Sequence, residues 1–183
     1  MKTTIKLLNA LCVIALAAVI GFTMLACTSL PEGAEESTLT PDASNAVVYF
    51  LQPRLRSGAG DIVIWDGETP VGKMDGGLYM NVAYKAKPGT HYFLANRFNW
   101  SNAKVDIRAN NVYYISLNWA PNPIPFSSSF IILEVMTQKD GIEQFQNNEE
   151  TIAFTDEWRN EYKSSLSEKD LAELRENLSA ARK

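Results

Sequence analysis

His91 is the side chain in this sequence with the clearest capacity for acid–base chemistry. It is the only histidine among 183 residues, and an imidazole that titrates near neutral pH can act as a general base. It stands at the start of a predicted strand, with no cysteine near it and no serine in a Gly-x-Ser-x-Gly turn. A histidine in this setting is more often structural than catalytic. We therefore expect no catalytic residues in this chain.

Four acidic residues near one predicted hairpin could meet at a calcium ion: Asp61, Asp66, Glu68 and Asp75. Calcium prefers oxygen ligands, but their spacing matches no calcium-binding loop, and aspartate is common in turns for reasons of backbone hydrogen bonding. One histidine and two cysteines exclude a zinc site with several histidines. The chain also lacks a glycine-rich phosphate-binding loop. We predict no metal site and no bound cofactor.

Cys27 has a different chemistry because of the sequence that precedes it. Lys2 and Lys6 give a positive start, and residues 7–31 are uncharged and include a strongly apolar core, which is the pattern of a secretory signal peptide. The residues Met24-Leu25-Ala26-Cys27 resemble the bacterial lipobox, in which the cysteine is acylated on sulfur, becomes the new N-terminus and is acylated again. We predict that residues 1–26 are removed and that Cys27 carries covalent lipid.

Two other interpretations of this N-terminal segment stay open. Residues 7–26 are mostly apolar and long enough to form an uncleaved transmembrane helix. Alternatively, an ordinary signal peptidase could cut beside Cys27 and leave an unmodified thiol. The interpretations differ in whether Cys27 is processed.

Aromatic and amide side chains are concentrated in two predicted loops. Phe98 and Trp100 stand among asparagines in the first loop, and Trp119 and Phe126 flank a proline-rich stretch in the second. Aromatic rings beside polar groups suit protein or sugar partners. The simpler interpretation, which we favour, is that Trp100 and Trp119 cap the ends of a core. The four residues are therefore only a candidate binding patch.

The composition separates the chain into unlike parts. The formal net charge of −4 argues against nucleic acid as a partner, since a binder of nucleic acid needs clustered positive charge. The hydrophobic fraction of 46% averages the apolar N-terminal segment with a chain of ordinary composition. Residues 27–45 carry acidic side chains and no basic one. We predict that they form a flexible tether behind the lipid.

Residues 46–136 have the pattern of an all-β domain, because short runs rich in Val, Ile, Tyr and Phe alternate with turn residues. We predict a mainly β fold, an antiparallel β-sandwich of about seven to eight strands. A tight hairpin is expected at Asp66-Gly67, with the aspartate bonded to the turn backbone, and Gly72 is expected at a bulge or close approach. The predicted strands are residues 46–52, 61–65, 71–74, 78–84, 91–98, 104–107, 112–119 and 130–136.

Residues 137–183 change to helical spacing, so C-terminal α-helices are expected beside the sandwich. Three hydroxyl residues are placed to cap helices: Thr137, Thr155 and Ser167. In the first helix we expect Ile142 and Phe145 to face the sheet. In the last helix an apolar stripe is formed by Leu171, Leu174 and Leu178.

The β region resembles a family of bacterial lipoproteins of unknown function, domain of unknown function 2846. The likeness covers residues 46–135, and its elements follow one another as AVVYFLQP, IVIWDGETPVGKM, GGLYMNVAYKAKPGTHYFLA, NNVYYISLNW and FIILEV. The family has no established activity. The resemblance therefore implies an architecture and a location, and it supplies no catalytic residues.

Together these observations predict a membrane-anchored envelope lipoprotein. Its β-sandwich domain would be non-catalytic and act through contacts with an envelope protein or with cell-wall glycan. Thr28, rather than an aspartate, follows Cys27, which favours the outer membrane in a Gram-negative organism; otherwise we expect the outer face of the cell membrane. The rival hypothesis is an envelope hydrolase that uses His91 and a loop carboxylate. A third, a transmembrane-anchored accessory subunit, requires that Cys27 is not processed.

Overall fold

The computed structural model describes residues 30–52, 61–74, 80–97, 99–120, 130–148 and 150–183. The chain divides into two units, Met1–Pro31 and Glu32–Lys183. Every element described below belongs to the second unit.

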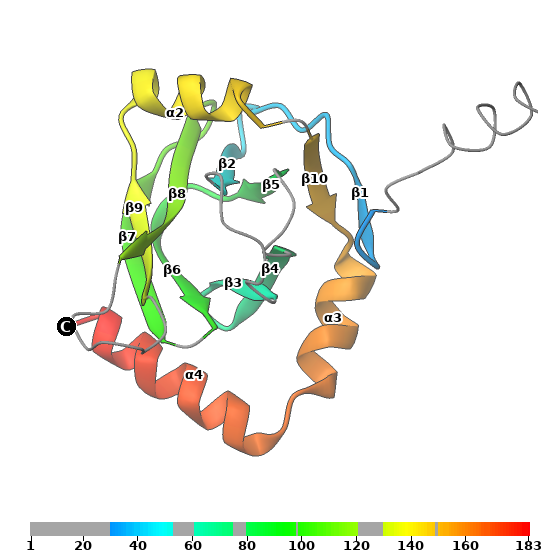
Figure 1. Cartoon of the computed structure of the whole chain (residues 1–183), viewed down its shortest axis with the longest axis vertical. Helices are drawn as coiled ribbons and strands as arrows, with labels where there is room; N and C mark the ends of the chain where they lie inside the picture. The colour runs from blue at the N-terminus through cyan, green and yellow to red at the C-terminus, as the bar shows by residue number, and fades with distance from the viewer. Residues whose placement is uncertain (1–29, 53–60, 75–79, 98, 121–129, 149) are drawn as a thin grey trace, which may run out of the picture. The chain divides into compact units, whose positions relative to one another are not determined.

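Two β-sheets build this unit (Figure 1). The larger sheet has the strand order β1-β10-β5-β2-β8-β9. Its strands are β1 (Ala34–Glu36), β2 (Ala46–Leu51), β5 (Met80–Ala86), β8 (Val112–Ala120), β9 (Phe130–Val135) and β10 (Glu150–Phe154). The smaller sheet has the order β4-β3-β6-β7. Its strands are β3 (Ile62–Asp66), β4 (Thr69–Met74), β6 (Gly89–Asn96) and β7 (Trp100–Ile107).

Most neighbouring strands are antiparallel, but β2 runs parallel to β8 and β10 runs parallel to β5. The prediction of a mainly β fold with antiparallel-rich sheets and C-terminal helices is confirmed. The eight predicted strands correspond to β2 through β9, and β7 begins earlier than expected, at Trp100. The parallel pairs arise because β2 and β8, like β5 and β10, are joined through long connections rather than hairpins.

The core lies between the two sheets and joins them. Phe50 on β2 and Phe93 on β6 are fully buried, and their ring centroids are 5.2 Å apart in an edge-to-face arrangement. Ile64 on β3 and Ile115 on β8 are also fully buried. Alternation along each strand sends one set of side chains into this core and the other set to the outer face of the sheet.

The edge strands β7 and β9 are linked by side chains. The amide of Asn99 accepts a hydrogen bond from the Ile131 backbone N–H at 2.7 Å and donates one to the Ile131 carbonyl at 3.0 Å. Ser101 Oγ accepts from the Leu133 backbone N–H at 2.9 Å. On β9, the backbone N–H and C=O of Ile131 and the N–H of Leu133 therefore have partners, although an open edge strand would leave such groups unpaired.

The segment predicted as a flexible tether contributes to the folded unit, which corrects that prediction for residues 34–45. Ala34–Glu36 form β1, which pairs with β10. Gly33 lies so close to the Trp158 ring that no side chain would fit there, and its carbonyl accepts from the Thr155 backbone N–H. The acidic composition of this segment hid the strand, because the contacts that order it come from residues far along the chain.

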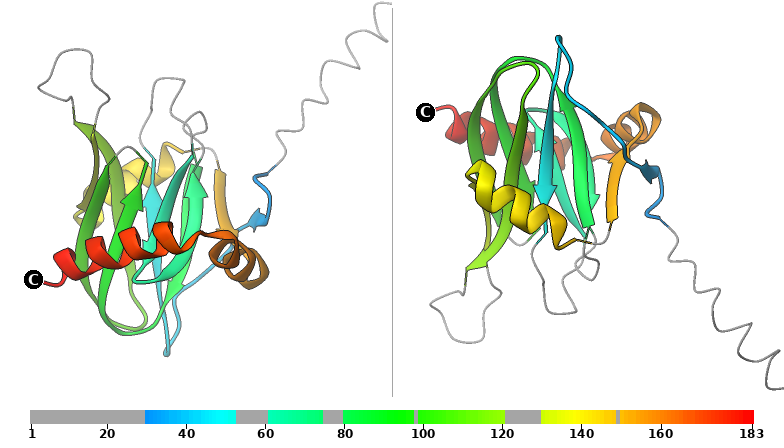
Figure 2. Two further views of the ribbon diagram at one scale, coloured as in Figure 1. Left: turned by 90° about the horizontal axis from the view of Figure 1, so that it is seen from below. Right: turned by 90° about the horizontal axis from the view of Figure 1, so that it is seen from above.

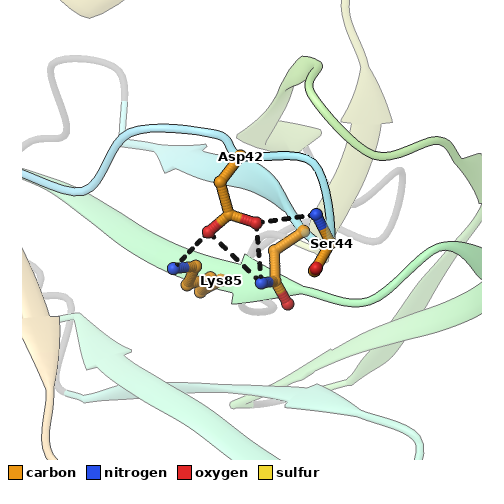
Figure 3. A network of polar contacts seen from close by, with 4 residues as sticks. Asp42, Ser44 and Lys85 are labelled. Atoms are coloured by element: carbon orange, nitrogen blue, oxygen red, sulfur yellow. Dashed lines mark hydrogen bonds and ion pairs between the residues drawn. The ribbon is translucent and has the colours of Figure 1, made fainter.

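Asp42 fixes the turn that leads into β2 (Figure 3). Its carboxylate accepts from the Ser44 backbone N–H at 2.8 Å and from the Asn45 amide at 3.0 Å, and it pairs with Lys85 on β5 at 2.7 Å. The hydrogen bond from Lys85, followed by those from Ser44 and Asn45, lowers the pKa of the Asp42 carboxyl far below its usual range. The turn is thus tied to the neighbouring strand before the chain enters the sheet.

Three helices lie in the C-terminal part of the described chain: α2 (Gln138–Gln146), α3 (Asp156–Ser165) and α4 (Glu168–Ala181). Their predicted caps are confirmed, since Thr137, Thr155 and Ser167 each accept a hydrogen bond from the first turn. At α4, Ser167 and Asp170 complete a capping box. Figure 2 shows α2 across the outer face of the larger sheet and α4 across the strands of the smaller one.

Two features of this region differ from the prediction. Residues 137–183 were expected to be helical, but β10 lies between α2 and α3 and buries Ile152 and Phe154 in alternation. Ile142 was expected to face the sheet, but the residue is 42% exposed. The face of α2 that packs on the sheet carries Gly141 and Phe145, because Gly141 leaves room for the Tyr114 ring.

Gly72 offers a test of the core. An added Cβ would lie 2.7 Å from Phe154 Cδ2 and 2.8 Å from Val82 Cγ1, so the predicted close approach is confirmed. We expect Gly72→Ala to lower the free energy of unfolding by about 1–3 kcal/mol through overpacking, measured by urea denaturation. Gly67→Asn is the control, because Gly67 has φ +59° with open space around it and asparagine tolerates that conformation. An equal loss in both variants would contradict the packing explanation.

Candidate functional site

Some of the residues singled out from the sequence lie outside the described residues. These are Cys27, Phe98, Phe126 and Asp75. Among the residues that are described, no helix combines the length and the apolar character needed to cross a bilayer.

His91 on β6 belongs to a polar cluster at one end of the core. Its Nδ1 lies 2.7 Å from Asp66 Oδ2, at the end of β3, and its Nε2 lies 2.8 Å from the Lys87 carbonyl oxygen. The Tyr84 hydroxyl on β5 donates to the same Asp66 oxygen at 3.1 Å. The side chains of His91 and Asp66 are only 15% and 13% exposed. The cluster therefore connects three strands from both sheets.

The electrostatics of this cluster follow from its partners. Both ring nitrogens of His91 face acceptors, so only the doubly protonated imidazolium can donate to both. The hydrogen bond to Asp66 raises the pKa of His91, and burial of the ring opposes that effect in part. Burial, followed by the negative charge of Asp66, raises the pKa of the Tyr84 hydroxyl well above its usual range.

This geometry favours a structural role for His91. A general base needs an unprotonated nitrogen that can reach a substrate proton, whereas both nitrogens of His91 already have protein partners. Asp66 was expected to bond to its own turn, but its carboxylate reaches Tyr84 and His91 instead. The turn itself is supported by Gly67 at positive φ. The Asp66 carboxylate is therefore available to link β3 to β5 and β6.

The carboxylates considered as calcium ligands have separate partners. Asp61 pairs with Lys73 at 2.9 Å, Asp66 with His91, and Glu68 with Arg175 at 3.4 Å. Within the part of the chain that the structure describes, no group of three or more His, Cys, Asp or Glu residues is arranged to hold a metal ion.

Trp100 lies in a strand, not in a loop as expected. Trp119 lies near the end of β8, in agreement with the predicted strand 112–119, and the two tryptophans have different surroundings. Trp119 on β8 follows the buried residues Ile115 and Leu117 in alternation and lies 5.5 Å beneath the Arg97 guanidinium. Trp100 on β7 packs against the cluster beneath α4. Both are half-buried.

A pocket of about 130 Å³ lies between the outer face of the smaller sheet and the junction of α3 and α4. Three aromatic rings and three polar side chains line it: Trp65, Trp100, Tyr162, Asn96, Asp170 and Glu173. Beneath it, Trp65 and Leu94 on the sheet pack against Leu174 and Leu178 on α4. Two leucines of the apolar stripe predicted on α4 thus hold this helix against the sheet, where it forms one wall of the pocket.

The polar atoms of the pocket differ in their pairing. Trp100 Nε1 donates to Glu173 Oε1 at 2.7 Å. Trp65 is 4% exposed, and its buried Nε1–H has no hydrogen-bond partner among the described residues. Burial, together with nearby carboxylates, raises the pKa of the Tyr162 hydroxyl, and hydrogen bonds from Ser167 lower the pKa of the Asp170 carboxyl. Trp65 Nε1–H is therefore a buried, unpaired donor in the wall of a pocket that two exposed carboxylates also line.

Among the residues that line the pocket, the sequence indicated Trp100 as a candidate for binding but gave no such indication for Trp65, Tyr162 and Glu173. The four-residue spacing of Trp158, Tyr162 and Leu166 places them on one helix face, which could have marked Tyr162 as a residue that packs on a sheet. No local signal places that helix face against Trp65. The pocket depends on the approach of α3 and α4 to the sheet.

Comparisons with known protein families, with curated proteins and with solved structures each give no match to this chain.

The His91 cluster predicts that stability depends on pH. Because the pKa of folded His91 lies above the unfolded value of about 6.5, its contribution is complete below that pH and is lost as the pH rises through the folded pKa. We expect the free energy of unfolding in urea to fall across this window, and His91→Gln to remove the decrease. The single imidazole signal in NMR spectra reports the pKa directly. A parent protein whose stability rises with pH there would contradict this account.

Proposed function

We propose that this protein is a lipid-anchored component of the bacterial cell envelope that acts through contacts with an envelope protein or with cell-wall glycan, not through catalysis. The observation that carries the proposal is Met24-Leu25-Ala26-Cys27 directly after an uncharged apolar stretch. Such a cysteine receives two or three acyl chains, which together hold a protein firmly on a membrane. The resemblance of residues 46–135 to bacterial lipoproteins agrees with this location.

The anchor would keep the folded unit near the membrane. The first strand begins at Ala34, and seven extended residues span at most about 25 Å. The start of β1 would therefore lie within about 25 Å of the lipid surface. Ala34–Glu36 are paired in a sheet. The segment that links the lipid to the folded unit is therefore shorter than the predicted tether, which extended to residue 45.

The geometry around His91 supports the non-catalytic part of the proposal over the hydrolase. A hydrolase would need His91 to exchange protons with a nucleophile or a water, but its nitrogens are bonded to Asp66 and to the Lys87 carbonyl. His91 does not line the pocket between the smaller sheet and α4. It also does not line a second pocket, whose lining includes Glu32 and Trp158.

Metabolic labelling with palmitate tests the anchor. We expect the full-length parent to take up label and to sediment with membranes, whereas Cys27→Ser should remain unlabelled because the acceptor sulfur is absent. Cys12→Ser is the matched control and should be labelled like the parent, since Cys12 leaves with residues 1–26.

Three outcomes would refute the anchor. Label that persists in Cys27→Ser would exclude Cys27 as the acceptor. A parent without label that keeps its full mass in the membrane would indicate the uncleaved helix. A parent without label in the soluble fraction, cut beside Cys27, would indicate ordinary secretion.

A further inference from the structure

The first strand is attached to the folded unit largely through its backbone. In β1, Ala34 is half-buried and both glutamates are exposed. The strand lies at the edge of the larger sheet and pairs with β10 alone (Figure 1). Two main-chain hydrogen bonds flank this pairing. The Ser37 N–H donates to the Thr151 carbonyl at 2.8 Å, and the Thr155 N–H donates to the Gly33 carbonyl at 3.1 Å. A strand that buries so little apolar surface can open without unfolding the rest of the protein.

The neighbouring strand β10 does not require β1. It pairs with β5 on its other side, and Ile152 and Phe154 are buried in the core. Departure of β1 would expose backbone groups along one edge of β10, and water can bond to those groups. β10 is therefore part of the core, whereas β1 is attached to the outside of it.

Gly33 controls whether β1 can attach. Its φ is +74°, a conformation that residues with a side chain rarely adopt. A Cβ added at Gly33 would also overlap Cβ, Cγ and Cδ1 of Trp158 on α3. The attached state thus depends on the fit of one glycine against one indole ring.

Negative charges oppose the attachment. A pocket of about 350 Å³ lies beside Gly33, and its lining includes Glu32 from the N-terminal segment and both Glu157 and Glu161 from α3. All three residues are exposed, and the lining includes no basic side chain. Carboxylates close to one another repel, and salt weakens the repulsion. The attached state is therefore a balance between main-chain hydrogen bonds and like charges.

We propose that residues 32–36 form a releasable latch, which is docked on β10 and α3 in this structure and undocks while the core stays folded. After release, the first fixed point of the chain is Asp42, which pairs with Lys85. The fifteen residues from Cys27 to Asp42 span at most about 50 Å, against about 25 Å for the docked state. The latch would thus set how far the folded unit reaches from the membrane. This effect on reach rests on the anchor proposed above, whereas the opening of the latch does not.

Hydrogen exchange followed by NMR on the full-length parent tests the latch. The backbone amides of Ser37 and Thr155, called the latch amides, report its opening. The Val47 amide, which donates to the Asn111 carbonyl at 3.1 Å, reports the core. We expect the latch amides to exchange together and at least about tenfold faster than Val47. Raising NaCl from about 0.02 M to about 0.5 M should slow their exchange relative to Val47 about two- to fivefold, because salt screens the repulsion.

Three variants test the named contacts. Gly33→Ala should undock the latch and speed exchange of the latch amides at least about tenfold, while Val47 stays protected. Gly67→Ala is the matched control, because Gly67 also has positive φ but has open space around it, and it should leave the latch amides unchanged. The double variant Glu157→Gln with Glu161→Gln changes exposed residues and should slow latch exchange about two- to fivefold at low salt. Thermal unfolding verifies that each variant is folded.

Several results would overturn the proposal. Latch amides that exchange as slowly as Val47 in the parent would refute the latch. Loss of Val47 protection in Gly33→Ala would show that the latch is part of the core. Exchange that does not respond to salt would contradict the role of Glu32, Glu157 and Glu161.

The effect on reach has its own test. On nanodiscs with a paramagnetic lipid headgroup, signals of the folded unit should be broadened less in Gly33→Ala than in the parent, and equal broadening would refute the longer reach. A latch that opens in a chain that takes up no palmitate would keep the opening and refute its effect on reach.

Discussion

The burial of apolar side chains between the two sheets is the constraint on which the other features depend. Phe50 and Phe93 meet there from opposite sheets, with ring centroids 5.2 Å apart. Because side chains alternate along a strand, the residues between the core positions lie on the outer faces, and some of them, such as Trp65 and Leu94, are apolar. Those faces require cover of their own, and the amphipathic helices α2 and α4 provide it.

The polar cluster around Asp66 acts at the end of this core. Asp66 connects β3 to His91 on β6 and to Tyr84 on β5, so it joins the two sheets where the apolar layer ends. The Arg159 guanidinium on α3 lies 5.5 Å over the Tyr84 ring, which helps to position α3. That placement brings Tyr162 over Trp65 and forms one side of the pocket.

Local sequence signals predicted much of this fold. The helix caps at Thr137, Thr155 and Ser167 and the turn at Gly67 involve residues a few positions apart, so their chemistry is visible in the sequence. β1 was missed because its three residues are mostly acidic and it is held by β10. Ile142 was misplaced because helical spacing shows which residues share a face, not which face meets the sheet.

The sequence by itself determined the mainly β character, the starts of the three helices and the motif at Cys27, because each depends on neighbouring residues. Only the tertiary structure decided that Trp65, Trp100 and Tyr162 surround one pocket, and that Asp66 meets His91 and not its own turn. These groups come from β3, β6, β7 and α3. Whether they meet depends on which faces of the strands and helices pack together. The burial of apolar side chains throughout the core determines that packing.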